Sequence, residues 1–225
     1  MHWCIGQITS DFISRMENIL DLYQQPYDPK HPVICFDEKQ FQMVSNVVED
    51  IPMKPGSPRK QDSEYKREGT CCILIAFEPK TGKRMIQVKQ HRTKIDYAHF
   101  MNDFVQDYLE AESIQLVQDN LNTHTAASFY EAFPPQEAFE LMKKFEYHYT
   151  PIKGSWLNMV EIEISALSRQ CLNRRIGDIG TLAKEIRAWE QERNKKRVTV
   201  QWEFSKEKAR DKLRRHYLNV QNLCS

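Results

Sequence analysis

Two aspartates stand at the polar ends of apolar segments that have the length of buried strands. Residues 32–39 read PVICFDEK and residues 113–120 read SIQLVQDN, so that Asp37 and Asp119 each end an apolar run. If the two strands are neighbours and run in the same direction, their carboxylates converge at one edge of the sheet. Mg²⁺ and Mn²⁺ prefer oxygen ligands and relieve the repulsion between clustered carboxylates. The pattern therefore indicates a cation site that needs a third acid.

The third acid is available in residues 153–172, which have a helical period. At about 100° per residue, Glu161 and Glu163 project in well-separated directions, one at each edge of the apolar stripe. Periodicity alone does not choose between them. Glu38 points to the opposite face of the strand from Asp37, which favours a structural or solvent-facing role over metal binding.

The elements that must position these acids are strands and helices in mixed order. We expect helices at residues 8–24, 94–110, 126–144 with an interruption at two prolines, 153–172, 181–196 and 205–217, and a hairpin of residues 70–79 and 83–90. A further short strand is expected at 145–151. The order predicts a mixed α/β sheet flanked by helices, with parallel pairing wherever a helix connects two strands.

Length and composition limit the class of protein. A chain of 225 residues is long enough for one sizeable packed domain. With 32 basic and 31 acidic residues the net charge is +1, so any polyanion must be bound by local patches. Six cysteines without a CxxC pair are typical of reduced, buried thiols inside the cell, and no apolar run is long enough to cross a membrane. We expect a cytoplasmic protein with no membrane partner.

Local basic residues are candidates for contacts with phosphates, which would make binding dependent on salt. They are Arg59, Lys60, Lys66 and Arg67 in an expected exposed loop at 53–69, Arg92 and Lys94 after the hairpin, and Lys153 before the helix that carries Glu161. The alternative for each is a solvated charge. Lys212 and its basic neighbours on the last helix are interpreted as a plain solvated face, and Trp156 as a core residue.

Asn120 and His124 follow the strand that ends at Asp119. They could orient an acid, a water molecule or the scissile phosphate. Alternatively, Asn122 or Thr123 caps the next helix and His124 only closes its first turn. The sequence supports the two roles equally.

An ordered set of motifs resembles the DDE transposases of bacterial insertion sequences in the mariner-like superfamily. The motifs are CFDEK (35–39), EYKREGT (64–70), AFEPKTGKR (76–84), RTKIDYAHFM (92–101), LVQDNLNTH (116–124), YHYTPIKGSWLNMVEIEISALSRQCLNRRI (147–176) and VQWEFSKEKARDKL (200–213). The resemblance implies a ribonuclease H-like catalytic core at 31–175, with a helical lead-in at 1–30 and a helical extension at 176–225. It also implies that Asp37, Asp119 and Glu161 are the catalytic and metal-binding triad, which selects Glu161 over Glu163.

The activity implied by this resemblance is two-metal phosphoryl transfer with Mg²⁺ or Mn²⁺, in which DNA is cut at the ends of an element and joined to target DNA. The expected partners are transposon-end and target DNA and a second copy or a full-length transposase, with the protein at the nucleoid when bound to DNA. The helix-turn-helix domains that usually precede such a core are expected to be absent from this chain.

Two other classes of protein are compatible with the sequence. One is a truncated, non-catalytic regulatory fragment that associates with full-length transposase. The other is a ribonuclease H-like nuclease with another nucleic-acid substrate, for which only the fold argues.

Overall fold

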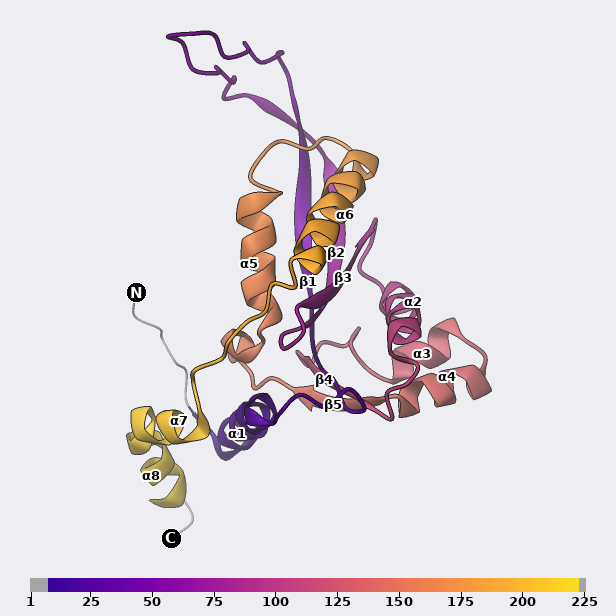
Figure 1. Cartoon of the computed structure of the whole chain (residues 1–225), viewed down its shortest axis with the longest axis vertical. Coiled ribbons are helices and arrows are strands. Elements are labelled where there is room, and N and C mark those ends of the chain that lie inside the picture. The colour runs from indigo at the N-terminus through magenta and orange to yellow at the C-terminus, as the bar shows by residue number, and fades with distance from the viewer. Residues whose placement is uncertain (1–7, 223–225) are drawn as a thin grey trace.

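The computed structural model describes residues 8–222, and its centre is a five-stranded mixed sheet (Figure 1). The strands are β1 (Val33–Asn46), β2 (Tyr65–Glu78), β3 (Lys83–Lys89), β4 (Ile114–Gln118) and β5 (Phe145–Tyr149), in the order β3-β2-β1-β4-β5. Strands β1, β2 and β3 pair antiparallel, whereas β4 is parallel to both β1 and β5. The predicted mixed sheet is confirmed, as is the parallel pairing of the two aspartate-bearing strands.

Helices cover both faces of the sheet. One layer contains α1 (Ser10–Gln24), α5 (Val160–Gln170), α6 (Ile179–Lys195) and α7 (Lys206–Lys212), and the other contains α2 (Lys94–Val105), α3 (Ala127–Ala132) and α4 (Pro135–Lys143). Helix α8 (Arg214–Asn222) follows α7. Strand β2 shows why two cores form, since Cys71, Ile73 and Ile75 pack in the first core and the intervening Cys72 and Leu74 in the second.

Strand β1 is longer than the sequence indicated. It was expected to end near Asp37, but it continues to Asn46, and the exposed loop expected at 53–69 is instead residues 47–64, because β2 begins at Tyr65. The cause is the antiparallel partner: β1 and β2 remain paired as far as Asn46 and Tyr65, whereas β1 pairs with β4 only as far as Cys35. The β1–β2 hairpin therefore projects from the sheet as an arm (Figure 1).

Two predicted terminal segments extend beyond the residues that the structure describes. The lead-in expected at 1–30 and the extension expected at 176–225 each include residues outside the described range of 8–222. Within that range, no helix has the length and apolar character needed to cross a membrane.

Candidate active site

Asp37 and Asp119 lie at the same level on neighbouring parallel strands. Cys35 of β1 pairs with Val117 of β4, and each aspartate comes two residues later along its strand direction. Adjacent strands are about 4.8 Å apart, and residues two apart share a face of the sheet. Asp37 therefore belongs to the face where Cys35 packs in the first core, and Asp119 stands beside it directly after the end of β4.

Glu161 reaches this place from the helix that covers the same face. Val160, Ile164 and Leu167 of α5 are buried in the first core, and Glu161 lies in the first turn of that helix. Both Asp119 and Glu161 raise the pKa of Asp37 through their charge, after a larger effect of burial. The structure thus brings the three sequence-predicted acids into one electrostatic neighbourhood.

The acids carry negative charge that the protein only partly compensates. Burial is the largest cause that raises the pKa of Asp37 to about 7, although its Oδ1 accepts a hydrogen bond from the backbone N–H of Glu38 at 2.8 Å. Burial also raises the pKa of Glu161, while the charge of Lys39 lowers it. Within residues 8–222, Asp37 has no ion-pair partner, so this partly buried carboxylate favours a proton or an added cation.

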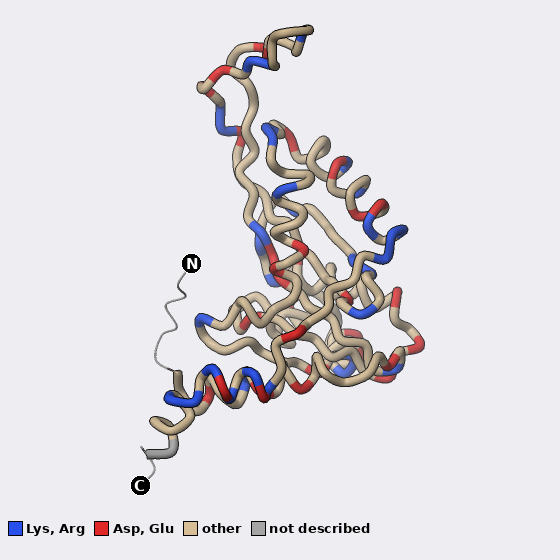
Figure 2. Tube along the Cα trace, turned by 60° about the vertical axis from the view of Figure 1, so that its left-hand side comes forward, with Lys and Arg blue, Asp and Glu red and all other residues tan. Residues whose placement is uncertain are grey.

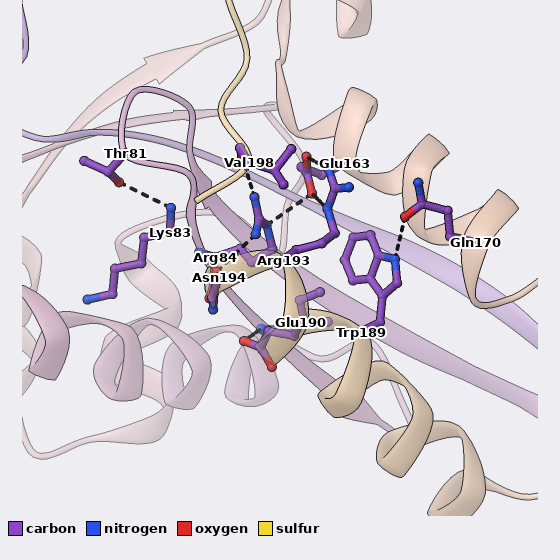
Figure 3. A network of polar contacts seen from close by, with 11 residues as sticks. Thr81, Lys83, Arg84, Glu163, Gln170, Trp189, Glu190, Arg193, Asn194 and Val198 are labelled. Carbon is purple, nitrogen blue, oxygen red and sulfur yellow. Dashed lines mark hydrogen bonds and ion pairs between the residues drawn. The ribbon is translucent and has the colours of Figure 1, made fainter. Parts of the chain in front are cut away.

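Glu163 forms ion pairs with two arginines, and this distinguishes it structurally from Glu161. Its carboxylate is fully buried and lies 3.1 Å from Nε of Arg84 on β3 and 2.6 Å from Nη2 of Arg193 on α6 (Figure 3). Glu161 is only partly buried. Of the two glutamates, only Glu161 is free to bind a cation or substrate.

The network around Glu163 joins α5 to α6 and β3. Asn194 on α6 accepts a hydrogen bond from the backbone N–H of Arg84 at 3.0 Å, and Glu190 accepts one from the N–H of Ile86 at 3.0 Å (Figure 3). Burial raises the pKa of Glu190 to about 7. Through these contacts and the Arg193–Glu163 pair, α6 is joined to both β3 and α5.

His124 connects Asp119 to Glu38. Its Nδ1 lies 2.6 Å from Oδ1 of Asp119, and its Nε2 lies 2.6 Å from Oε2 of Glu38. Burial alone would lower the pKa of His124, but its hydrogen bonds to Asp119 and Glu38 outweigh burial and raise the pKa to about 9. At neutral pH the imidazolium therefore bonds to both carboxylates. The ring also stacks on Tyr97, and these contacts give His124 more than a turn-closing role.

Asn120 and Glu38 differ in the contacts that they make near Asp119. Asn120 is exposed, and its side chain forms no hydrogen bond with other residues of the described range, so a role for it stays a prediction. Glu38 is buried in contact with His124 and with Arg92, whose Nη1 lies 2.9 Å from it. The predicted structural role of Glu38 agrees with this placement.

The predicted phosphate-binding residues are spread over the molecule. Arg59, Lys60, Lys66 and Arg67 all lie on the β1–β2 arm. The tip of its paired part, at Asn46, is about 30 Å along β1 from Asp37 at 3.3 Å per residue. Arg59 pairs with Asp50 and Lys66 with Glu68. The arm cations therefore do not flank the acids, and their contact with DNA stays a prediction.

Three other predicted cations lie closer to the sheet. Arg92 pairs with Glu38, and Lys94 pairs with Glu131 on α3. Lys153 is exposed in the turn before α5, where its φ is +62°. Figure 2 shows Lys and Arg interspersed with Asp and Glu along the arm and α6.

Sequence reasoning missed two residues beside the acids. The side chain of buried Asn158 donates from Nδ2 to the backbone carbonyl of Phe36 at 2.8 Å, and the backbone carbonyl of Asn158 accepts from the backbone N–H of Glu161 at 3.1 Å. It thereby ties the residue before Asp37 to the start of α5. The other residue is Lys39, two positions after Asp37 on β1. Both left a signal: Asn three residues before an acid at a helix start, and a period of two along a strand.

The residues at this site fit a hard divalent cation in donor chemistry. The set is all carboxylate oxygen, which Mg²⁺ and Mn²⁺ prefer, and both hydrogen bonds that described residues make to Asp119 go to Oδ1. Within residues 8–222, however, no group of three or more His, Cys, Asp or Glu side chains is already drawn together as a closed cation site. Mutual repulsion of the carboxylates is consistent with this open arrangement.

Comparison with known proteins places the chain in a family. A model of the family described as DDE superfamily endonuclease matches residues 32–183. The Mos1 transposase paired-end complex with left transposon end is similar at a TM-score of 0.56 and 15% sequence identity, over 88% of this chain and 64% of that chain. The Mos1 mariner paired end complex with Mn is similar at 0.53 and 15%, over 88% and 61%. A search of the curated proteins finds no match. The structural likeness confirms the predicted ribonuclease H-like fold.

Proposed function

The chain belongs to the DDE superfamily of endonucleases, and from this premise we propose that it is a transposase catalytic domain that cuts and joins DNA with divalent cations. Its DNA substrates would be the ends of an insertion sequence and a target site. The similar Mos1 transposase complexes, one with a left transposon end and one with Mn, support this choice of substrate and cofactor.

One observation carries the proposal. Asp37 on β1 and Asp119 directly after β4 stand at one level of neighbouring parallel strands, and Glu161 lies in the first turn of the helix packed on the face of Asp37. A partly buried Asp37 with a pKa of about 7 and no cationic partner within residues 8–222 is costly for a protein to keep unless the charge is used. A site for cations and phosphate accounts for that cost.

Asp37, Asp119 and Glu161 would hold the cations, two Mg²⁺ or Mn²⁺ ions. When bound, such ions activate a water or 3′-hydroxyl nucleophile and stabilise the leaving oxygen. The chain's own residues prepare the site: His124 holds Asp119 through Oδ1, and Asn158 fixes the start of α5 against β1. Lys39 supplies a positive charge beside Glu161 for a DNA phosphate.

The test is strand cleavage of plasmid DNA that carries the ends of the element. We expect nicking that requires Mg²⁺ or Mn²⁺ and is lost in Asp37→Asn, Asp119→Asn and Glu161→Gln. Asp103→Asn, an exposed acid on α2, is the matched control and should cleave normally. Nicking that persists in all three variants would exclude this site.

Joining and association are tested separately. Supply of a free 3′-hydroxyl transposon end should yield a joined product with target DNA under the same metal conditions. Preferential cleavage of RNA–DNA hybrids would instead indicate a different nuclease. Association with a second copy is tested by light scattering with and without transposon-end DNA.

A further inference from the structure

A large aromatic groove begins at Glu161 and Asn158 of the site described above and extends away from the two aspartates. Its volume is about 860 Å³, and it lies among α1, α5, α7 and the segment of residues 201–204. Its apolar wall consists of Phe12, Trp156, Ile162, Trp202, Phe204 and Leu213. Trp156, which sequence reasoning placed in the core, is only partly buried here and meets Phe204 edge-on at 5.7 Å between ring centroids.

The face of α5 toward this groove runs from an acid to a cation. Glu161, Ser165 and Arg169 all line the groove, and they follow one another at intervals of four residues on a single helical face. At a rise of 1.5 Å per residue, Arg169 lies about 12 Å along the helix from Glu161. The groove therefore leads from the proposed cation site to the positive charge of Arg169, over a distance that a few nucleotides can span.

Two cations at the groove are available for an anion. Arg169 and Lys212 are exposed, and neither forms an ion pair with any residue in the range 8–222. Arg210 on the same helix as Lys212 is, by contrast, paired with Glu17. Lys212 Nζ lies 5.3 Å from the centre of the Phe204 ring. Its placement differs from the plain solvated face expected from sequence.

Trp202, whose side chain lines the groove, has a buried donor without a partner among the described residues. The indole Nε1 of Trp202 is buried and donates to no acceptor in the part of the chain that the structure describes. A buried donor without an acceptor costs about 1–3 kcal/mol.

We propose that this groove binds unpaired nucleotides of the DNA strand that enters the acidic site, with bases against the aromatic rings and phosphates on Arg169 and Lys212. Aromatic platforms beside cations are how proteins bind single strands without sequence preference. Continuity with Glu161 and the unpaired cations favour DNA over an apolar helix of a second copy. The inference rests on the proposed function, because the groove gains its meaning from the strand cut at its end.

The test measures binding of an oligodeoxythymidylate of about ten nucleotides, by quenching of tryptophan fluorescence in EDTA, so that no cleavage occurs. The double variant Arg169→Ala/Lys212→Ala should bind about tenfold more weakly, with a salt dependence lower by about two phosphate contacts. Lys195→Ala, an exposed cation on α6 without an ion-pair partner within residues 8–222, should bind like wild type. Equal affinity of the double variant and this control would overturn the proposal.

A second variant separates the two proposals and the rival occupant. Ile162→Glu places a negative charge on an exposed groove position, so circular dichroism should be unchanged while oligonucleotide binding falls. If plasmid nicking is absent in wild type but oligonucleotide binding follows these variants, only the proposed function fails. If Ile162→Glu dissociates a dimer in light scattering and leaves oligonucleotide affinity unchanged, the groove is a protein interface and the inference fails alone.

Discussion

Replacement of Asp37 by asparagine is expected to stabilise the metal-free protein while it abolishes function. The aspartate is partly buried beside two other carboxylates, and its pKa is raised from 3.8 to about 7. At about 1.4 kcal/mol per pKa unit, the buried charge costs roughly 4 kcal/mol above pH 7. Asparagine has the same shape without the charge, but it weakens the hydrogen bond from Glu38. We expect a net gain of about 1–3 kcal/mol in the free energy of unfolding at pH 8.

The pH dependence has a defined sign. Because the folded protein holds the Asp37 proton more tightly than the unfolded chain, this group makes stability fall as pH rises from about 4 through 7. The advantage of Asp37→Asn should therefore be small near pH 4 and complete above pH 7. Urea unfolding followed by circular dichroism in EDTA, at pH 5 and pH 8, measures it, with Asp103→Asn as the control for the substitution.

Added Mn²⁺ supplies the second half of this test. A cation that binds only the folded protein stabilises it by mass action, so Mn²⁺ should raise the melting temperature of wild type and not of Asp37→Asn. If the variant is no more stable than wild type at pH 8, or if both respond equally to Mn²⁺, then Asp37 is not a strained cation ligand and the reasoning is refuted.

Three further predictions concern the residues around the acids. Glu163→Gln should lower the free energy of unfolding by about 3–5 kcal/mol in urea titrations, because buried Arg84 and partly buried Arg193 lose their partner. The matched Glu161→Gln should change it by less than about 1 kcal/mol, and equal losses would place both glutamates in the same kind of site. Asn158→Ala should lower the free energy of unfolding by about 1–3 kcal/mol, because the side-chain hydrogen bond from Asn158 to the carbonyl of Phe36 is lost. It should also reduce the nicking rate per folded molecule, and an unchanged rate per folded molecule would show that this hydrogen bond does not position the acids. His124 contributes stability below pH 6.5 that is lost as pH rises through about 9. In EDTA, the free energy of unfolding of wild type should therefore fall between pH 8 and 10 more steeply than that of His124→Gln. Parallel curves would contradict the claim that His124 is protonated at neutral pH.

Features that depend on local sequence patterns could be predicted from the sequence. An apolar run before a turn located the core of β2, the apolar stripe located α5, and the paired prolines located the break between α3 and α4. Two apolar runs that end in aspartate also predicted the meeting of Asp37 and Asp119, because parallel neighbours align their carboxyl ends.

Partners distant in the chain set the remaining features. Arg84 and Arg193 commit Glu163 to the interior, yet they lie on β3 and α6 and share no local pattern with it. The pairing of Glu38 with His124 depends in the same way on the return of the chain after β4. The length of β1 beyond Asp37 followed from pairing with β2, since its residues there carry little apolar signal.

The account depends most on the claim that Asp37, Asp119 and Glu161 together bind divalent cations. Calorimetric titration of the metal-free protein with Mn²⁺, at pH 8, tests this claim directly. We expect saturable binding to wild type and at least about tenfold weaker binding to Asp37→Asn, Asp119→Asn and Glu161→Gln, with Asp103→Asn unchanged. Mn²⁺ affinity that is absent in wild type, or that survives in all three variants, would contradict it.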